Sequence, residues 1–240
     1  MIITGFEYQP TVRGEWAPDD DTSYWSAITR AVRVPDRVGT DGILDFGPFA
    51  VAIGNMDKES ILSYTYETGY RKRLEKNLVL DGTVYYSDYQ NTIQGTSQSG
   101  IDFLYGFEGV AKYQFNPRLR MELSYAYNEG EKRLVDDANL PVVRLPKHSI
   151  NLRSYYNLTS SMDFDVMIYF VDETQGNSAS LIIPAYTRLD LRYGWRTTKQ
   201  LELSLLLTNL LDETHPEAID AFKISTAVER GDMLKITYTK

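Results

Sequence analysis

The chain has 240 residues, of which 24% are charged, with a formal net charge of −8 at pH 7 and no cysteine. The absence of cysteine excludes disulfides and thiolate metal sites, and the acidic balance without a basic cluster argues against a nucleic-acid-binding surface. No run of about 18 apolar residues occurs, which excludes a helical membrane span, and the aromatic content is rich in tyrosine, with 18 Tyr against 9 Phe and 3 Trp.

In chain order, the predicted elements are strands in which apolar and polar residues alternate. The pattern begins at 6–16, recurs at 62–71, 119–127 and 163–170, and continues through 187–195 and 201–208. In 187–195, Leu189 and Leu191 share one face while Arg188, Asp190 and Arg192 share the other. Side chains on a strand point alternately to opposite sides, so each ribbon has an apolar face and an ionic face. This is typical of a strand with lipid on one side and a wet or protein-filled lumen on the other.

About eleven such segments occur, each of roughly ten residues, the length that a tilted strand needs to cross a bilayer. Short connections with turn chemistry are expected at 18–21, 74–77, 116–118, 159–162 and 197–200. Long connections alternate with them, at 34–58, 91–102, 128–146, 172–184 and 212–225. This layout is typical of outer-membrane barrels, which have tight periplasmic turns and long external loops.

The sequence therefore predicts an all-β fold, an antiparallel transmembrane β-barrel in the outer membrane of a Gram-negative bacterium. We expect one partial barrel domain over residues 1–240, with membrane lipid on its apolar face. A complete bacterial barrel has an even number of strands, so an odd count indicates part of a larger barrel.

Six motifs carry a family resemblance in the expected order and spacing. They are WAPDDDTSYWSAITRAVRVPDR at 16–37, ESILSYTYETGYRKRL at 59–74, LDGTVYYSDYQNTI at 80–93, IPAYTRLDLRYGW at 183–195, NLLDETHPEA at 209–218 and TAVERGDMLKITY at 226–238. Together they resemble the barrel domain of TonB-dependent outer-membrane receptors, and they cover nearly the whole chain. The resemblance implies the C-terminal half of a meander barrel of about 22 strands, the size of plugged transporters.

The resemblance also implies partners and a function. The partners are the plug domain, the remaining barrel strands, TonB through a preceding segment, and the barrel assembly machinery. The last partner would read a C-terminal signal formed by Gly231, Leu234, Ile236 and Tyr238, although the chain ends in Thr239-Lys240 rather than in an aromatic residue. Residues 1–5 run directly into a strand without a secretion signal or a plug. We therefore expect a truncated gene product or an excised piece of a receptor.

The principal candidate site is a charged wall facing the lumen. Its members are Glu67, Arg71, Arg120, Glu122, Arg153, Arg188, Asp190, Arg192 and Glu202. In a receptor such a wall grips the plug through ion pairs. Alternatively, neighbouring charges neutralise one another across strands without a gating role. The two interpretations are compatible, and both remain open at this point.

Other polar residues suggest no further chemistry. His148 and His215 have no Ser or Cys partner at a recognisable spacing, so we expect exposed histidines in loops or at strand ends rather than catalysis or metal ligation. The acidic run at 19–21 lacks the other oxygen ligands of a calcium loop and is expected to be a solvated turn. Asp136 and Asp137 lie in an external loop where they could meet a cationic ligand or calcium, and ordinary solvation is the favoured interpretation. The loop residues that could touch a substrate cannot be ranked; they are Phe46, Phe49, Tyr89 and Arg144.

Three classes of function follow from these predictions. The favoured one is part of a TonB-dependent receptor that takes up an iron-siderophore, cobalamin or an oligosaccharide, with this chain supplying barrel wall and external loops. The alternative is a stand-alone porin-like or structural barrel, closed alone or by pairing two copies. An outer-membrane hydrolase is disfavoured because no Ser-His constellation is present, so we expect no enzyme and no cofactor.

Overall fold

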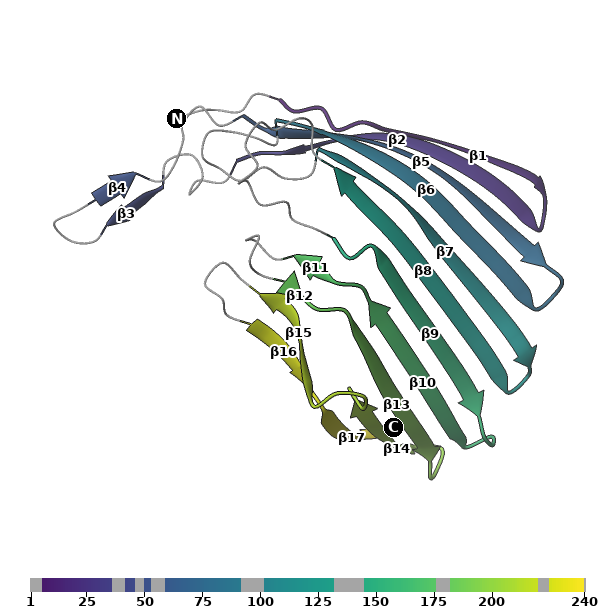
Figure 1. The fold of residues 1–240 in the computed structure, drawn as a ribbon. Coiled ribbons are helices and arrows are strands. Elements are labelled where there is room, and N and C mark those ends of the chain that lie inside the picture. The colour runs from purple at the N-terminus through teal and green to yellow at the C-terminus, as the bar shows by residue number, and fades with distance from the viewer. Residues whose placement is uncertain are drawn as a thin grey trace.

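The computed structural model describes residues 6–35, 42–45, 50–52, 59–91, 102–131, 145–175, 182–219 and 225–239. One sheet of eleven strands dominates it, in the order β1-β2-β5-β6-β7-β8-β9-β10-β13-β14-β17 (Figure 1). Every neighbouring pair in this sheet is antiparallel. The predicted all-β fold and the predicted number of strands are both confirmed.

The eleven strands are 8 to 14 residues long. Their bounds are β1 Thr11–Asp19, β2 Thr22–Arg33, β5 Ile61–Leu74, β6 Leu78–Gln90, β7 Phe103–Asn116, β8 Leu119–Glu131, β9 His148–Asn157, β10 Met162–Val171, β13 Tyr186–Arg196, β14 Leu201–Thr208 and β17 Gly231–Tyr238. Three long connections contain small hairpins, which are β3 Ile43–Asp45 with β4 Ala50–Ala52, β11 Thr174–Gln175 with β12 Ile182–Ile183, and β15 Thr214–Ile219 with β16 Ser225–Glu229.

Short and long connections alternate as predicted, with the short turns at one end of the sheet and the long connections at the other (Figure 1). Some expected bounds were wrong. The first strand begins at Thr11 rather than at residue 6, because Pro10 has no N–H for the ladder and contributes only its carbonyl, which accepts from the Arg30 amide. The connection expected at 128–146 is shorter, since β8 continues to Glu131.

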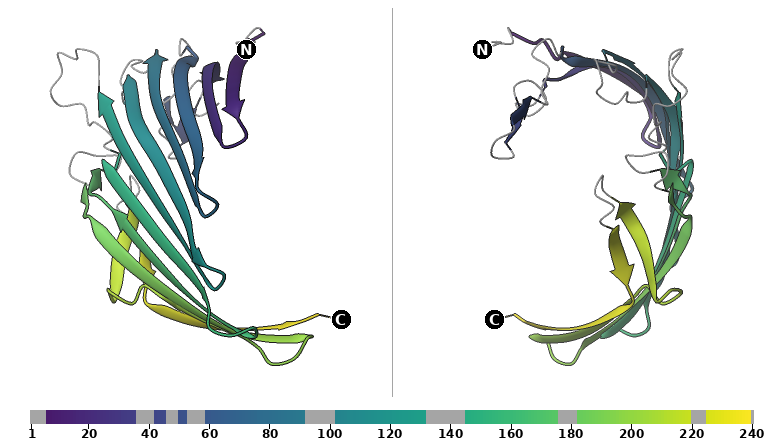
Figure 2. Two further views of the ribbon diagram at one scale, coloured as in Figure 1. Left: turned by 90° about the vertical axis from the view of Figure 1, so that its right-hand side faces the viewer. Right: turned by 60° about the vertical axis from the view of Figure 1, so that its left-hand side comes forward.

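The sheet curls along its strand order into an open trough whose two edges are β1 and β17 (Figure 2). Its convex face is apolar and solvent-exposed. Large hydrophobic side chains on that face include Val12, Trp16, Tyr24, Ile28, Tyr66, Tyr70, Val84, Tyr86, Phe107, Leu123, Ile150, Tyr156, Trp195, Leu205, Leu234, Ile236 and Tyr238. An exposed apolar surface of this extent is what a lipid-facing wall needs.

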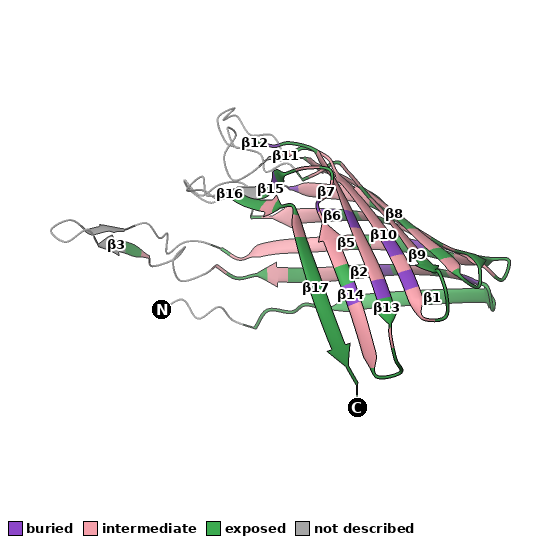
Figure 3. Cartoon of the chain, turned by 90° about the horizontal axis from the view of Figure 1, so that it is seen from below, coloured by how far each residue is buried: buried purple, intermediate pink, exposed green. Residues whose placement is uncertain are grey.

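The sheet has almost no apolar core. Among the described residues, Ala27 and Ile183 are the only buried hydrophobic ones, and most positions are intermediate or exposed (Figure 3). Several buried positions are polar instead, including Asp163, Asp165 and Asp190. The described part of the chain contains no helix long and apolar enough to cross a bilayer. Apolar packing is therefore left to whatever surrounds the convex face, and the polar groups gather on the other side.

Candidate functional site on the concave wall

Strand register places all nine predicted wall residues on one face of the sheet. Directly opposed residues share a face, and the register joins Arg192 to Asp165, Glu122 to Arg153, and Glu67 to Tyr85. That face is the concave one. The β15–β16 hairpin lies inside the curve of the sheet (Figure 2), and its residue Glu217 contacts Arg188 of the wall at 3.8 Å.

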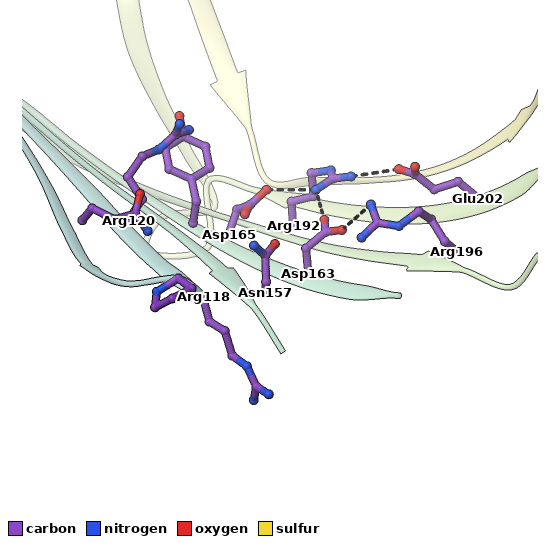
Figure 4. A pocket seen from close by; sticks show the side chains of 11 residues that line it. Arg118, Arg120, Asn157, Asp163, Asp165, Arg192, Arg196 and Glu202 are labelled. Carbon is purple, nitrogen blue, oxygen red and sulfur yellow. Dashed lines mark hydrogen bonds and ion pairs between the residues drawn. The ribbon is translucent and has the colours of Figure 1, made fainter. Parts of the chain in front are cut away.

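Arg192 is the centre of an ion network that joins three strands. Its guanidinium binds Asp163 and Asp165 of β10, the latter at 2.9 Å, and Glu202 of β14 at 3.0 Å (Figure 4). Arg196 lies 3.3 Å from the other oxygen of Asp163. Three carboxylates thus converge on one half-buried guanidinium, which links β10, β13 and β14. We name these five residues the Arg192 network.

A second charged group occupies the loop end of the same wall. Arg188 donates to both oxygens of Asp190, at 2.9 and 2.7 Å, in a bidentate pair. Asp190 is buried, and its Oδ1 also accepts from the backbone amide of Asn209 at 2.9 Å. A buried carboxylate needs such partners, because an isolated ion would lose its hydration without compensation.

The other wall residues are paired locally or carry no ionic partner. Arg71 binds Asp81 at 2.5 Å, and Glu122 lies 3.5 Å from Lys112. Within the described ranges, Glu67, Arg120 and Arg153 form no ion pair. The Arg120 guanidinium instead lies 4.4 Å from the centre of the Tyr155 ring. Arg153 donates to Asn151 and lies 5.9 Å from the centre of the Tyr169 ring.

The charged residues of the wall fall into two groups. Charges on β10, β13 and β14 neutralise one another, whereas β8 and β9 carry two guanidinium groups supported by rings but not by carboxylates. Cation–π contact stabilises such groups modestly and leaves donors available to a partner.

A hollow of about 420 Å³ lies between these two arrangements, at the turn end of the concave face (Figure 4). Its charged lining consists of four arginines and three carboxylates, namely Arg118, Arg120, Arg192, Arg196, Asp163, Asp165 and Glu202. All three carboxylates already bind Arg192, so Arg120 and Arg118 have no carboxylate partner among the described residues. The hollow is thus locally cationic although the chain as a whole is acidic.

Asp163, Asp165, Arg196, Asp81 and Lys112 belong to this wall but were not among its predicted members. For Asp163 and Asp165, the alternation in 163–170 already gave the signal, since both residues fall in its polar phase. The alternation does not predict that both carboxylates bind the same residue, Arg192. Asp165 faces Arg192 only because β10 and β13 pair in the observed register.

The remaining candidates are not members of this wall. His148 begins β9, where its Nδ1 lies 2.9 Å from the Tyr125 hydroxyl. The prediction of an exposed His215 was wrong, because the ring is buried against Tyr186 of β13. Residues 19–21 form the exposed β1–β2 turn, as expected, and no described group of three or more His, Asp or Glu could hold a metal ion.

Several predicted loop residues fall outside the described ranges; they are Phe46, Phe49, Asp136, Asp137 and Arg144. Tyr89 lies near the loop end of β6. The residues of the expected C-terminal signal all lie in the edge strand β17, where Gly231 is the first residue and Leu234, Ile236 and Tyr238 are exposed on the convex face.

Comparison with known proteins agrees with this geometry. The family model described as TonB dependent receptor-like, beta-barrel matches residues 4–210. The iron-regulated outer membrane virulence protein of Vibrio cholerae is 22% identical over 244 residues, which cover 87% of this chain and 36% of that protein.

Solved structures share the fold at low identity. The siderophore receptor PirA from Acinetobacter baumannii aligns with a TM-score of 0.75 at 15% identity, covering 97% of this chain and 41% of that one. The copper transporter OprC aligns with a TM-score of 0.72 at 15% identity, covering 96% of this chain and 40% of that one. The ferric-catecholate import receptor Fiu from Escherichia coli K12 aligns with a TM-score of 0.71 at 16% identity, covering 95% of this chain and 34% of that one. The chain thus spans little more than a third of the proteins it matches.

Proposed function

Because the chain belongs to the TonB-dependent receptor-like β-barrel family, we propose that it forms part of the wall of an outer-membrane receptor that imports a scarce nutrient. An iron-siderophore is the favoured substrate class, with cobalamin or an oligosaccharide as alternatives. The observation that carries the proposal is the two-sided trough, with an exposed apolar convex face and a charged concave face. A lipid-embedded wall around a protein-filled lumen requires this division.

The edges of the sheet support the same assignment. No described strand pairs with the outer edges of β1 and β17. In a bilayer each unsatisfied backbone donor or acceptor costs several kcal/mol, so an open sheet is not viable there. We therefore assign further barrel strands, pairing with both edges, as structural partners of this chain, and place its long connections on the cell exterior.

The plug is the partner assigned to the concave wall. Arg120 and Arg153 are its principal contacts in this proposal, because both project guanidinium donors that no described carboxylate occupies. Glu67 has a complementary role towards plug cations. The Arg192 network and the Arg188–Asp190 pair are already neutralised, so they stiffen the wall against which the plug rests. Arg71, Glu122 and Glu202 belong to this supporting group.

Assembly into the membrane is assigned to the last strand. In β17, Leu234, Ile236 and Tyr238 alternate on the convex face after Gly231, which is the pattern that barrel assembly machinery would read in this proposal. TonB is assigned as an energising partner that acts through a segment outside residues 1–240.

An uptake experiment tests the transport proposal. Cells lacking the gene and cells complemented with its complete reading frame are compared for accumulation of radiolabelled iron-siderophores, with and without TonB. We expect uptake that requires both the gene and TonB. Uptake that persists without TonB, or general permeability to small solutes of many kinds, would instead support the porin-like alternative.

A second experiment tests the plug contacts. Replacing both Arg120 and Arg153 by Gln should loosen the plug and increase entry of a large antibiotic through the receptor, while replacement by Lys preserves the charge. Arg73→Gln is the matched control, because Arg73 is exposed at a turn and already lies 3.6 Å from Asp21. Equal antibiotic entry for the double variant and the control would contradict the assignment.

A further inference from the structure

The connection that leaves β14 carries an amide, a carboxylate and an imidazole at the loop end of the concave wall. They belong to Asn209, Asp212 and His215, and His215 lies on β15, inside the curve of the sheet (Figure 2). We propose that these side chains bind one divalent transition-metal ion, with Asn209 Oδ1, an oxygen of Asp212 and His215 Nδ1 as ligands. The site goes beyond nutrient import and does not depend on which nutrient is carried.

Two buried atoms of this segment point to a missing ligand. Asn209 Oδ1 and His215 Nδ1 are the only buried side-chain nitrogen or oxygen atoms of the described ranges that have no hydrogen-bond partner. Asn209 is completely buried, and the His215 side chain is 7% exposed. Unpaired buried polar atoms destabilise a fold and are rare in native proteins. Two of them in one short segment are explained together by an ion that binds both.

Hydrogen bonds hold the Asn209 side chain beside the hairpin. Its Nδ2 donates to the Val228 carbonyl of β16 at 3.0 Å, and Val228 is paired with His215 in the hairpin. The backbone amide of Asn209 donates to Asp190 of the wall at 2.9 Å. Because Nδ2 is already occupied, Oδ1 is the polar atom of this side chain that is left to bind a cation.

The contacts of the His215 ring direct Nδ1 towards a ligand. The ring stacks on Tyr186 of β13, with centroids 4.2 Å apart and an interplanar angle of 21°. Its Nε2 lies 3.4 Å from Glu217 Oε1. A hydrogen on Nε2 that is directed at this carboxylate leaves the lone pair of Nδ1 free. Histidines that bind metals commonly donate their other ring N–H to a carboxylate in this way.

The separation between the imidazole and the carboxylate fits an ion between them. His215 Nδ1 lies 3.6 Å from Asp212 Oδ2, which is too long for a hydrogen bond. Two ligands of a tetrahedral ion with bonds of about 2.1 Å lie about 3.4 Å apart. A small movement of Asp212, whose side chain is 43% exposed, brings both atoms to this spacing. Solvent also reaches the site from the Asp212 side, so an ion can enter there.

The donor atoms select the class of ion. Imidazole nitrogen suits Zn²⁺, Cu²⁺ and Ni²⁺, whereas Mg²⁺ and Ca²⁺ prefer sites made of oxygens alone. The chain has no cysteine to supply a thiolate for softer ions. A bound ion would join Asn209, at the start of the connection, to His215 in the hairpin. Its structural effect is therefore to fasten the hairpin to the end of β14.

Zinc binding by the complete receptor tests the site. Isothermal titration with Zn²⁺ gives the number of bound ions and their affinity, and Mg²⁺ serves as the comparison ion. Co²⁺ is then used in place of Zn²⁺, because its visible absorption reports a four-coordinate site with nitrogen and oxygen ligands. We expect the unmodified receptor to bind one Zn²⁺ more than Asp212→Ala or His215→Phe. The readout is bound metal, so its result is independent of the uptake experiment.

Matched variants separate the site from other metal-binding groups. Glu213→Ala removes the neighbouring exposed carboxylate, and His148→Phe removes the only other histidine of the chain; both should bind Zn²⁺ like the unmodified receptor. Glu217→Gln should weaken binding by about 10- to 100-fold, as loss of a carboxylate behind a metal-binding histidine usually does.

The decisive comparison is between Asp212→Ala and Glu213→Ala. Asp212 is half-exposed, so its loss should leave the fold intact even if His215→Phe does not fold. Equal Zn²⁺ binding by the unmodified receptor and Asp212→Ala would overturn the proposal, as would an equal loss in Asp212→Ala and Glu213→Ala.

Discussion

The concave wall satisfies its polar side chains in two different ways. Across β10, β13 and β14, three carboxylates converge on Arg192. Across β1, β2, β5 and β6, neutral hydroxyls pair instead, as between Thr11 and Thr29 at 3.3 Å and between Thr65 and Ser87 at 2.9 Å. A neutral hydroxyl pair loses little hydration free energy when it is buried, and it links only two neighbouring strands. In the ion network, three strands depend on the single side chain of Arg192.

The two kinds of pairing occupy different halves of the sheet. The Arg192 network and the Arg188–Asp190 pair occupy the strands that carry the β15–β16 hairpin and the edge strand β17. The hydroxyl-paired strands carry only scattered single ion pairs among the described residues, which are Arg71–Asp81, Arg73–Asp21, Lys72–Asp19 and Arg30–Glu7, and no cation there is shared by three carboxylates. Shared ionic links between strands therefore concentrate next to the β15–β16 hairpin, whereas the β1–β6 half is linked by single pairs.

Removing the hub of the ion network gives the largest expected effect. Arg192→Met leaves three carboxylates close together, and we expect a loss of about 3–5 kcal/mol in the free energy of unfolding, the usual cost of breaking a buried pair from one side. Urea unfolding in lipid vesicles measures it. Arg192→Lys, which keeps the charge but not the planar fork, should lose less. An unchanged unfolding free energy in Arg192→Met would show that the three strands are not linked through this residue.

An arginine placed on the convex face tests whether charged side chains are tolerated on the concave face alone. Leu205→Arg places a cation among apolar side chains, and folding into vesicles should lose about 2–4 kcal/mol if the site lies near the bilayer midplane. Thr83→Arg is the matched control, because Thr83 is half-buried on the concave face directly opposite Glu108. The neighbouring Ser204 is unsuitable, since it is buried near the ion network. Equal penalties for the two arginines would reject the lipid and lumen assignment.

The hydroxyl pairs should respond far more weakly. Thr65→Val removes one partner of the 2.9 Å contact with Ser87, and we expect a loss of about 1 kcal/mol, the typical net value of one hydrogen bond. Thr83→Val serves as a control on the same wall. If Thr65→Val costs as much as Arg192→Met, the two halves of the wall do not differ in the way described above.

The alternation of residues was enough to predict the faces, the number of strands and the sorting of short and long connections. It works because a side-chain period of two survives any register, so all nine wall residues fall on one face as expected. The ion-pair partners of these residues could not be predicted in the same way. Which carboxylates meet Arg192 depends on the registers of β10 with β13 and of β13 with β14, and the first of these pairs is joined by a long connection rather than by a tight turn.

The position of His215 could not be predicted for a different reason. Its segment lies in a long connection, where the sequence has no alternation long enough to assign a face. Its burial follows from a contact with Tyr186, 29 residues earlier in the chain, and from the left-handed turn at Asn209. Tertiary contacts of this kind override the general expectation that loop histidines are exposed.

The smallest expected effect concerns the exposed Arg71–Asp81 ion pair within the hydroxyl-paired half. Arg71 is 66% exposed and Asp81 is 30% exposed, so solvent screens their attraction. A double-mutant cycle with Arg71→Gln and Asp81→Asn should give a coupling of about 0.2–1 kcal/mol, as for other exposed pairs, and 1 M salt should remove most of it. The Arg188–Asp190 pair, whose carboxylate is 6% exposed, provides the internal standard. Its coupling should be larger and should persist in salt, because little solvent reaches it. If both couplings fall equally in salt, burial does not distinguish the ion pairs of the two halves.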